Sequence, residues 1–182
     1  MSQPALPAVE LEASLHALHE ASFGWARSCC DGDPDDAADV LQSTYVKVLS
    51  GDARYGGRSS FKTWLFGVIR LTALEARRRA ARELSLAARH EQTADTRPAD
   101  AHLLEAEERQ SLRRALEQLP ARQQEVLLLV FYHELSISEA ADVMHVSVGS
   151  ARTHYDRGKK RMRSLLVPDA THEDPAAMGD PS

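Results

Sequence analysis

Residues 134–166 read ELSISEAADVMHVSVGSARTHYDRGKKRMRSLL, the pattern of two short helices that meet at a tight turn. Ser136 and Glu139 form a predicted capping box, in which the hydroxyl and the carboxylate each bond a backbone N–H left free at a helix start. A second N-cap is predicted at Ser147, just after the expected turn at His145. Such a pair is typical of a helix-turn-helix, whose second helix enters the major groove of DNA.

The second of these helices is strongly basic. Residues 149–163 hold six arginines and lysines against one acid, Asp156. Helical spacing turns Ala151, Tyr155 and Met162 toward a core. The polar side chains left to face DNA are Ser150, Arg152, Thr153, His154, Arg157 and Lys160. An ordinary solvated basic face is the alternative, which the coincidence of caps, turn and charge disfavours.

Composition is that of a small protein with one or two domains. The chain has 182 residues, of which 43% are hydrophobic and 27% charged. No apolar run approaches the roughly 18–20 residues that a membrane span needs, and no signal peptide is recognisable. We therefore expect a cytoplasmic protein without membrane insertion. Cys29 and Cys30 are adjacent, which suits neither a mutual disulfide nor a zinc site, so we expect buried or idle thiols.

The net charge of −5 conceals two basic blocks. Residues 1–53 carry nine acids against two bases, and residues 168–182 carry four acids and no base. Residues 70–89, in contrast, hold six arginines against two glutamates, and 149–163 form the second block. Because neutralising phosphates requires only a local positive patch, two separate contacts with nucleic acid are predicted.

Periodicity and stop signals predict two helices in the N-terminal part. The first covers residues 11–30 and ends before Gly32. Asp33 is a predicted N-cap ahead of Pro34, and the helix that follows runs to about Leu49. Its buried face is predicted to hold Ala37, Val40, Leu41, Thr44 and Val48. The opposite face would offer a partner Asp35, Asp39, Gln42, Ser43 and Val46.

A glycine-rich loop and a long helix follow. The loop, residues 51–60, lacks the spacing and the lysine of a phosphate-binding loop, so nucleotide hydrolysis is poorly supported. The helix that begins at Phe61 is first aromatic and then basic. Its aromatic rings could stack bases and its arginines could hold phosphates, although core packing is the simpler reading of the aromatics alone. The residues concerned are Phe61, Trp64, Arg70, Arg77 and Arg78, with Arg58 in the loop.

The whole chain is predicted to be all-α, with two small helical domains. The first covers residues 1–90, and the second, which contains the helix-turn-helix, covers 103–167. A flexible linker, 91–102, has no apolar periodicity, and an acidic tail, 168–182, is expected to be disordered. Residues 121–135 should form an apolar helix that supports the helix-turn-helix. Its predicted inner side holds Val126, Leu127, Val130 and Phe131.

Three blocks of sequence together resemble a bacterial RNA polymerase sigma factor of the extracytoplasmic-function group. They are DDAADVLQSTYVKVL at 35–49, SSFKTWLFGVIRLTALEARRR at 59–79, and a long block from LEQLPARQQEVLLL through DRGKKRM at 116–162. The likeness spans roughly residues 15–166. It implies that the two domains are the second and fourth conserved regions of the family, joined directly by the linker.

The resemblance implies partners and roles. The 35–49 helix would dock on the clamp of the largest subunit of core RNA polymerase, with Asp39 and Gln42 as the best matched contacts. The loop and the helix from Phe61 would open the promoter and capture its downstream element, and the last helix would read the upstream element. Whether a given side chain meets a base or a phosphate stays open. No catalysis, cofactor or metal is implied.

Two departures from the family pattern affect the docking helix, and one lies in the long helix. Acids are common in the family where this chain has Ala38 and Ser43, and asparagine is common where it has Leu71. One hypothesis is that phosphorylation of Ser43 or Thr44 by a Ser/Thr kinase restores negative charge and strengthens polymerase binding. The alternative is that a neutral residue is tolerated. An anti-sigma factor is the commoner means of control in the family.

Two other classes of function fit the sequence less well. A stand-alone helix-turn-helix regulator that binds duplex DNA without polymerase would explain the C-terminal domain but leave the acidic helix, the loop and the long helix without a role. An enzyme has weaker support. His16 and His19 share a helical face with Glu20, but the spacing is not that of a zinc protease and no third ligand is placed.

Overall fold

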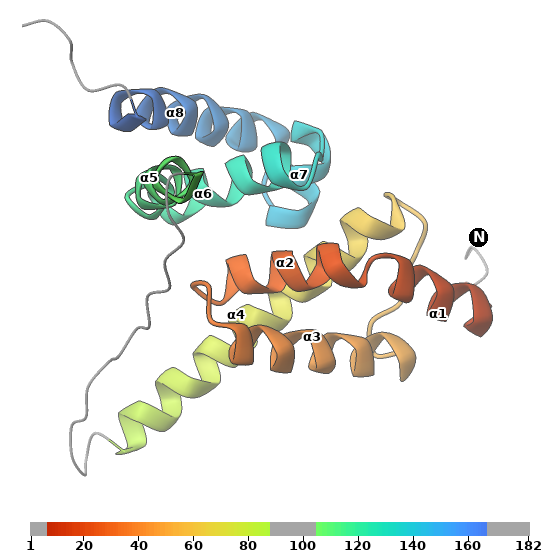
Figure 1. The fold of residues 1–182 in the computed structure, drawn as a ribbon. Helices are drawn as coiled ribbons and strands as arrows, with labels where there is room; N and C mark the ends of the chain where they lie inside the picture. The colour runs from red at the N-terminus through yellow and green to blue at the C-terminus, as the bar shows by residue number, and fades with distance from the viewer. Residues whose placement is uncertain (1–6, 88–104, 167–182) are drawn as a thin grey trace, which may run out of the picture.

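The computed structural model describes residues 7–87 and 105–166, and every regular element in these ranges is helical (Figure 1). The first unit contains α1 (Ala8–Ala17), α2 (His19–Cys29), α3 (Pro34–Leu49) and α4 (Phe61–Ala87). The second contains α5 (Glu105–Glu117), α6 (Ala121–Leu127), the π-helical turn η1 (Leu128–Tyr132), α7 (Ile137–Met144) and α8 (Val148–Leu166). The all-α prediction is confirmed. The predicted linker, 91–102, and tail, 168–182, lie outside the described residues.

Helix α3 is built as its sequence predicts. The carboxylate of Asp33 accepts the backbone N–H groups of Asp35 and Asp36, at 2.9 and 3.0 Å, and Pro34 occupies the first helical position. Gly32, with φ of +89°, supplies the left-handed turn between α2 and this cap. The five residues predicted to form the inner face are all buried: Ala37, Val40, Leu41, Thr44 and Val48. Local signals therefore fix both the start of α3 and its orientation.

The prediction of one helix over residues 11–30 was wrong, because the chain bends at Leu18. There φ is −99° and ψ is 4°, which ends α1 and begins α2. Leu15 is buried and Leu18 is half-buried against the core, on either side of the bend. The apolar spacing continues across the break, and this is why periodicity alone indicates a single helix.

The helix-turn-helix is confirmed in detail. The Ser136 hydroxyl accepts the N–H of Glu139 at 3.2 Å, and the Glu139 carboxylate accepts the N–H of Ser136 at 2.9 Å. His145 makes the turn in the left-handed region, with φ of +54°. The Ser147 hydroxyl then accepts the N–H of Ser150 at 3.1 Å and begins α8.

The helix predicted over residues 121–135 is interrupted by the π-helical turn η1, and this corrects one core residue. Val126 and Leu127 are buried and Val130 is half-buried, as predicted, but Phe131 is 63% exposed. A π-helical turn holds more residues than an α-helical turn. The residues that follow its start therefore face other directions than α-helical spacing predicts. Leu129 is fully buried instead of Phe131.

The two units pack on one another and share one apolar core. Buried residues of the first unit, such as Phe66 and Ile69, belong to the same cluster as Val126, Leu129 and Val143 of the second. Helix α4 packs against α7, and Figure 1 shows the C-terminal helices seated over α2 and α4. No described helix is both long enough and apolar enough to span a membrane. The second unit thus covers part of the first, while α3 lies on the opposite side of the molecule.

Candidate nucleic-acid interfaces

Helix α8 presents its predicted DNA-facing side chains to solvent. Ser150, Arg152, Thr153, Arg157 and Lys160 are exposed, and His154 is half-buried. The opposite face, with Ala151 and Gly158 buried, packs on α6 and α7. The hydroxyl groups of Ser150 and Thr153 bond locally, to Ser147 at 2.8 Å and to the Gly149 carbonyl at 3.0 Å. The basic side chains are therefore the ones that reach furthest from the helix.

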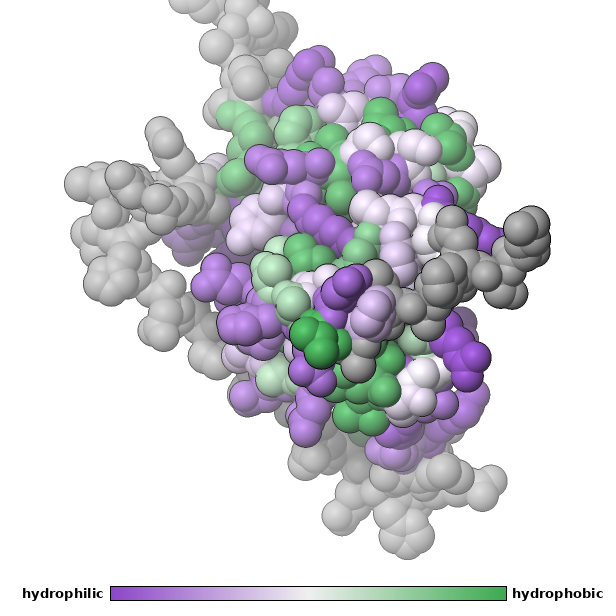
Figure 2. Space-filling model, turned by 90° about the vertical axis from the view of Figure 1, so that its right-hand side faces the viewer, coloured by the Kyte–Doolittle hydropathy of each residue, from purple (hydrophilic) through white to green (hydrophobic). Residues whose placement is uncertain are grey.

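An aromatic pair flanks this basic face. The rings of Phe131 and Tyr155 are stacked with centroids 5.8 Å apart, and the Lys159 ammonium lies 5.1 Å from the Tyr155 centroid. Sequence reasoning missed the exposure of Phe131, because the only signal for it is the π-helical turn. On the side of the molecule drawn in Figure 2, hydrophobic residues reach the surface in several patches between hydrophilic ones.

The first half of α4 holds an aromatic cluster beside the glycine-rich loop. Tyr55, Phe61 and Trp64 have ring centroids 5.3–5.4 Å from one another. The Tyr55 hydroxyl also donates to the carbonyl of Ser59 at 2.6 Å, which fixes the loop against the helix. Phe61 and Trp64 are half-buried and Arg58 is exposed. The rings are therefore compatible with both core packing and base stacking, because they pack together yet keep part of their surface in solvent.

The arginines of α4 separate into two groups. Arg77 and Arg78 lie exposed on the second half of the helix, where Arg77 pairs with Asp31 at 2.9 Å. Arg70 is only 7% exposed and pairs with Glu125 of α6, in the second unit. In this arrangement the guanidinium of Arg70 is bonded to the second unit, whereas Arg77 is paired within the first.

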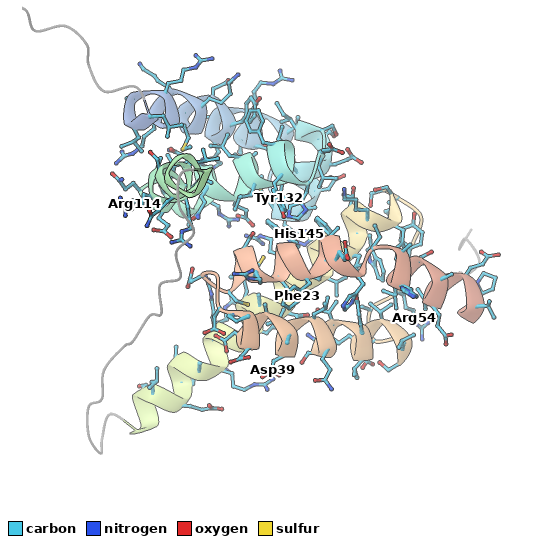
Figure 3. All side chains as sticks on the ribbon, viewed as in Figure 1. Phe23, Asp39, Arg54, Arg114, Tyr132 and His145 are labelled. Carbon is cyan, nitrogen blue, oxygen red and sulfur yellow. The ribbon has the colours of Figure 1, made fainter. Side chains whose placement is uncertain are left out.

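The outward face of α3 carries every predicted docking residue. Asp35, Asp39, Gln42, Ser43 and Val46 are all exposed, and Asp39 lies on the side of α3 turned away from the second unit (Figure 3). Leu49, 55% exposed, extends this face with an apolar side chain that sequence reasoning missed. Thr44 is fully buried and its hydroxyl donates to the Val40 carbonyl at 2.8 Å. Thr44 is thus inaccessible to a kinase in this fold, and Ser43 alone remains a candidate.

Within residues 7–87, the two cysteines are buried or half-buried and His19 has a hydrogen-bond partner. Cys29 and Cys30 are free, and burial raises the pKa of both thiols, that of Cys30 to about 11. His19 bonds the Tyr45 hydroxyl at 3.2 Å. Within the described residues, no three His, Cys, Asp or Glu side chains are grouped so as to hold a metal ion.

Comparison with known proteins gives a consistent result for both units. The family described as Sigma-70 region 2 matches residues 16–83, and Sigma-70, region 4 matches residues 109–162. The ECF RNA polymerase sigma factor SigX of Bacillus subtilis is 30% identical over 140 residues, which cover 74% of this chain and 72% of the relative. The ECF RNA polymerase sigma factor EcfG of Rhodopseudomonas palustris is 29% identical and covers 78% of this chain and 77% of its own.

Solved structures share the fold. The sigma factor RpoE, in complex with the anti-sigma factor NepR from Bartonella quintana, superposes with a TM-score of 0.68 at 24% identity. The match covers 88% of this chain and 98% of that one. CnrH, in complex with the cytosolic domain of CnrY, gives a TM-score of 0.60 at 22% identity, over 91% and 92% of the two chains.

Proposed function

The chain belongs to the extracytoplasmic-function group of RNA polymerase sigma factors, and from this premise we propose how its surfaces divide the work of transcription initiation. It binds core RNA polymerase and directs promoter-specific initiation. Members of the family are transcription factors and not enzymes. A stand-alone regulator would leave residues 16–83, which match region 2, without a role. What remains to be assigned is which residue meets which partner.

We assign the upstream promoter element to α8. The observation that carries this assignment is the two-sidedness of the helix: one face is packed on α6 and α7, and the other presents basic side chains to solvent. An exposed helix of this kind fits the major groove, where arginine can bond guanine or a phosphate. The aromatic and basic first part of α4, with its loop, is assigned to the downstream element and its melted strand.

Replacing Arg152 or Arg157 with alanine should weaken binding to the upstream element. A bidentate base contact is worth about 1–3 kcal/mol, so the affinity of the holoenzyme for a matched promoter should fall by roughly 5- to 150-fold for a base-reading arginine. A phosphate contact should instead weaken binding to all sequences alike. In vitro transcription over a promoter library, with core enzyme, separates the two. Arg113→Ala, an exposed position on α5, is the matched control. Unchanged promoter binding in both variants would show that α8 is misassigned.

We also propose that α3 docks on the clamp of the largest polymerase subunit through its exposed acids and Val46. The exposure of the whole face supports this, and so does its position on the side opposite the second unit. Ala38 and Ser43 reduce the negative charge that a basic clamp surface would attract. The exposed hydroxyl of Ser43 can take a phosphoryl group without disturbing the core, so phosphorylation there would restore charge.

The variant Ser43→Glu should therefore bind core polymerase several-fold more tightly than the unmodified chain, with the gain fading as salt screens the added charge. Ser43→Gln is the matched control, because it has nearly the same size and no charge. Affinity is measured by fluorescence anisotropy of the labelled chain titrated with core enzyme. Equal affinities of the Glu and Gln variants would mean that charge at this position does not govern docking.

A further inference from the structure

Helix α8 carries one acid in the middle of its basic face. Asp156 is exposed and lies four residues after Arg152 and four before Lys160, so these three side chains are neighbours on one side of the helix. The opposite side holds Ala151 and Gly158, which are buried, and packs on α6 and α7. Helix α8 lies at the outer edge of the second unit (Figure 1). The carboxylate of Asp156 therefore stands on the face that we assign to the major groove.

The ordinary structural roles of an acid in a helix do not account for Asp156. An acid stabilises a helix from its first turn, but α8 begins at Val148 and is capped by Ser147. An acid can also pair with a lysine three or four residues later, yet none of the ion pairs formed among the described residues includes Asp156. The ammonium of Lys159 lies over the Tyr155 ring instead. Neither capping nor pairing thus explains an acid at this position.

A carboxylate on this face opposes the attraction between α8 and the DNA backbone. It subtracts from the positive charge that neutralises phosphates, and it cannot accept a hydrogen bond from a phosphate. The major groove offers amino donors on two bases only, at N4 of cytosine and N6 of adenine. Guanine presents two acceptors there, and thymine presents an acceptor and a methyl group. A carboxylate that enters the groove is therefore compensated only where one of these amino groups lies opposite.

Gly149 gives the same face of α8 room to approach the bases closely. It lies seven residues before Asp156, which is two helical turns, so the two positions share one side of the helix. A Cβ atom at Gly149 would meet nothing closer than the Ser147 hydroxyl, at 3.9 Å, and φ there is not positive. Neither packing within the second unit nor backbone conformation requires this glycine. A position without a side chain instead suits a short acid such as Asp156, which reaches a base only when the helix lies deep in the groove.

We propose that Asp156 determines promoter specificity by accepting a hydrogen bond from the N4 amino group of a cytosine in the upstream element. Cytosine is the better partner because adenine places the acceptor N7 beside its amino group, where it repels the second carboxylate oxygen. Four residues rise by about 6 Å along a helix, and base pairs are about 3.4 Å apart, so the cytosine lies within about two base pairs of the Arg152 contact. This inference rests on the assignment of α8 to the upstream element.

The experiment uses holoenzyme formed from the full chain and core polymerase. The template is a promoter library that is randomised over the upstream element and constant elsewhere, and the transcripts are sequenced. We expect one position at which cytosine on one strand is preferred roughly 5- to 150-fold over guanine or thymine, the range of a single specific base contact. In Asp156→Ala this preference should disappear, while the other positions keep theirs.

The variant Asp156→Asn tests whether the side chain touches the base. An amide offers one donor and one acceptor, which match N7 and N6 of adenine, so the preference at the same position should change from cytosine to adenine. Asparagine has nearly the size of aspartate, so the packing of α8 is kept. Glu117→Ala is the matched control for charge, because it removes an exposed acid from α5 and should leave every preference unchanged.

Two results would overturn the inference and leave the proposed function intact. Identical sequence preferences in the unmodified chain and in both Asp156 variants would mean that this carboxylate reads no base. Loss of the cytosine preference in both variants, with no gain for adenine, would mean that Asp156 acts only by orienting Arg152, one turn away. A chain that drives no transcription with core polymerase from any promoter would count against the proposed function itself, and the inference would fall with it.

Discussion

Replacing Gly158 with valine should push α8 away from α6 and destabilise the second unit. Gly158 is buried where the two helices meet, and an added Cβ would lie 3.1 Å from the Leu127 Cδ1 atom and 3.3 Å from both the Cβ atom and the backbone carbonyl of Gln123. The carbonyl cannot yield without moving α6. Valine adds two further methyl groups, so the overpacking should cost about 1–3 kcal/mol or more.

Thermal unfolding followed by circular dichroism measures this cost. For a unit of this size, 1–3 kcal/mol lowers the midpoint by roughly 5–20 °C. Gly149→Val is the matched control on the same helix, because a Cβ there meets nothing closer than the Ser147 hydroxyl, at 3.9 Å. An unchanged midpoint for Gly158→Val, or an equal fall in both variants, would mean that the close approach of α8 to α6 is not what holds the helix in place.

The elements with strong local signals could be predicted from the sequence. The capping box at Ser136, the cap at Asp33 and the inner face of α3 depend on residues within a few positions of one another, and all three are confirmed. The bend at Leu18 and the π-helical turn were missed. Each is a small change of backbone geometry that leaves the apolar spacing nearly intact, so tertiary packing and not periodicity selects it.

The candidate site was less predictable from the sequence, because contacts between residues far apart in the chain decide which partner each side chain has. Arg70 was predicted to meet DNA because it begins a basic block, yet in the structure it bonds Glu125, which is 55 residues further along the chain. A pattern of basic residues predicts that a side chain pairs with an anionic group. It does not predict whether that group is a DNA phosphate or a carboxylate of the same chain. Thr44 illustrates the same point for burial, since the phosphorylation hypothesis used its proximity to Ser43 while its own place on the inner face hides it.

Acidification should loosen the contact between the two units, because His133 is buried as a neutral imidazole. Burial against the uncharged rings of Trp25 and Phe66 lowers the pKa of His133 from 6.5 to about 4, and the Lys62 ammonium of α4 acts in the same direction. The other titratable group in ring contact is Tyr132, in η1. Nε2 of His133 has no hydrogen-bond partner among the described residues, so a proton placed there would lack an acceptor.

The direction of this pH dependence follows from which state of the protein binds the proton. Below pH 6.5, His133 in the separated form takes up a proton that it does not take up while the two units are packed together. The stability of the contact is therefore fully present above that pH and is lost as the pH falls toward 4. A pKa lowered by this much corresponds to about 3 kcal/mol at most. Between pH 7.5 and 5.5 the equilibrium should shift roughly tenfold toward the separated form.

Tryptophan fluorescence emission at low protein concentration measures the separation of the two units, because Trp25 contacts the His133 ring and Trp64 lies outside that contact. The emission of the unmodified chain should change as the pH falls from 7.5 to 5.5, while His133→Gln, which cannot take up the proton, should show almost no change. His16→Gln removes an exposed histidine from α1 and should titrate like the unmodified chain. The same titration in His133→Gln as in the unmodified chain would assign the acid response to another group.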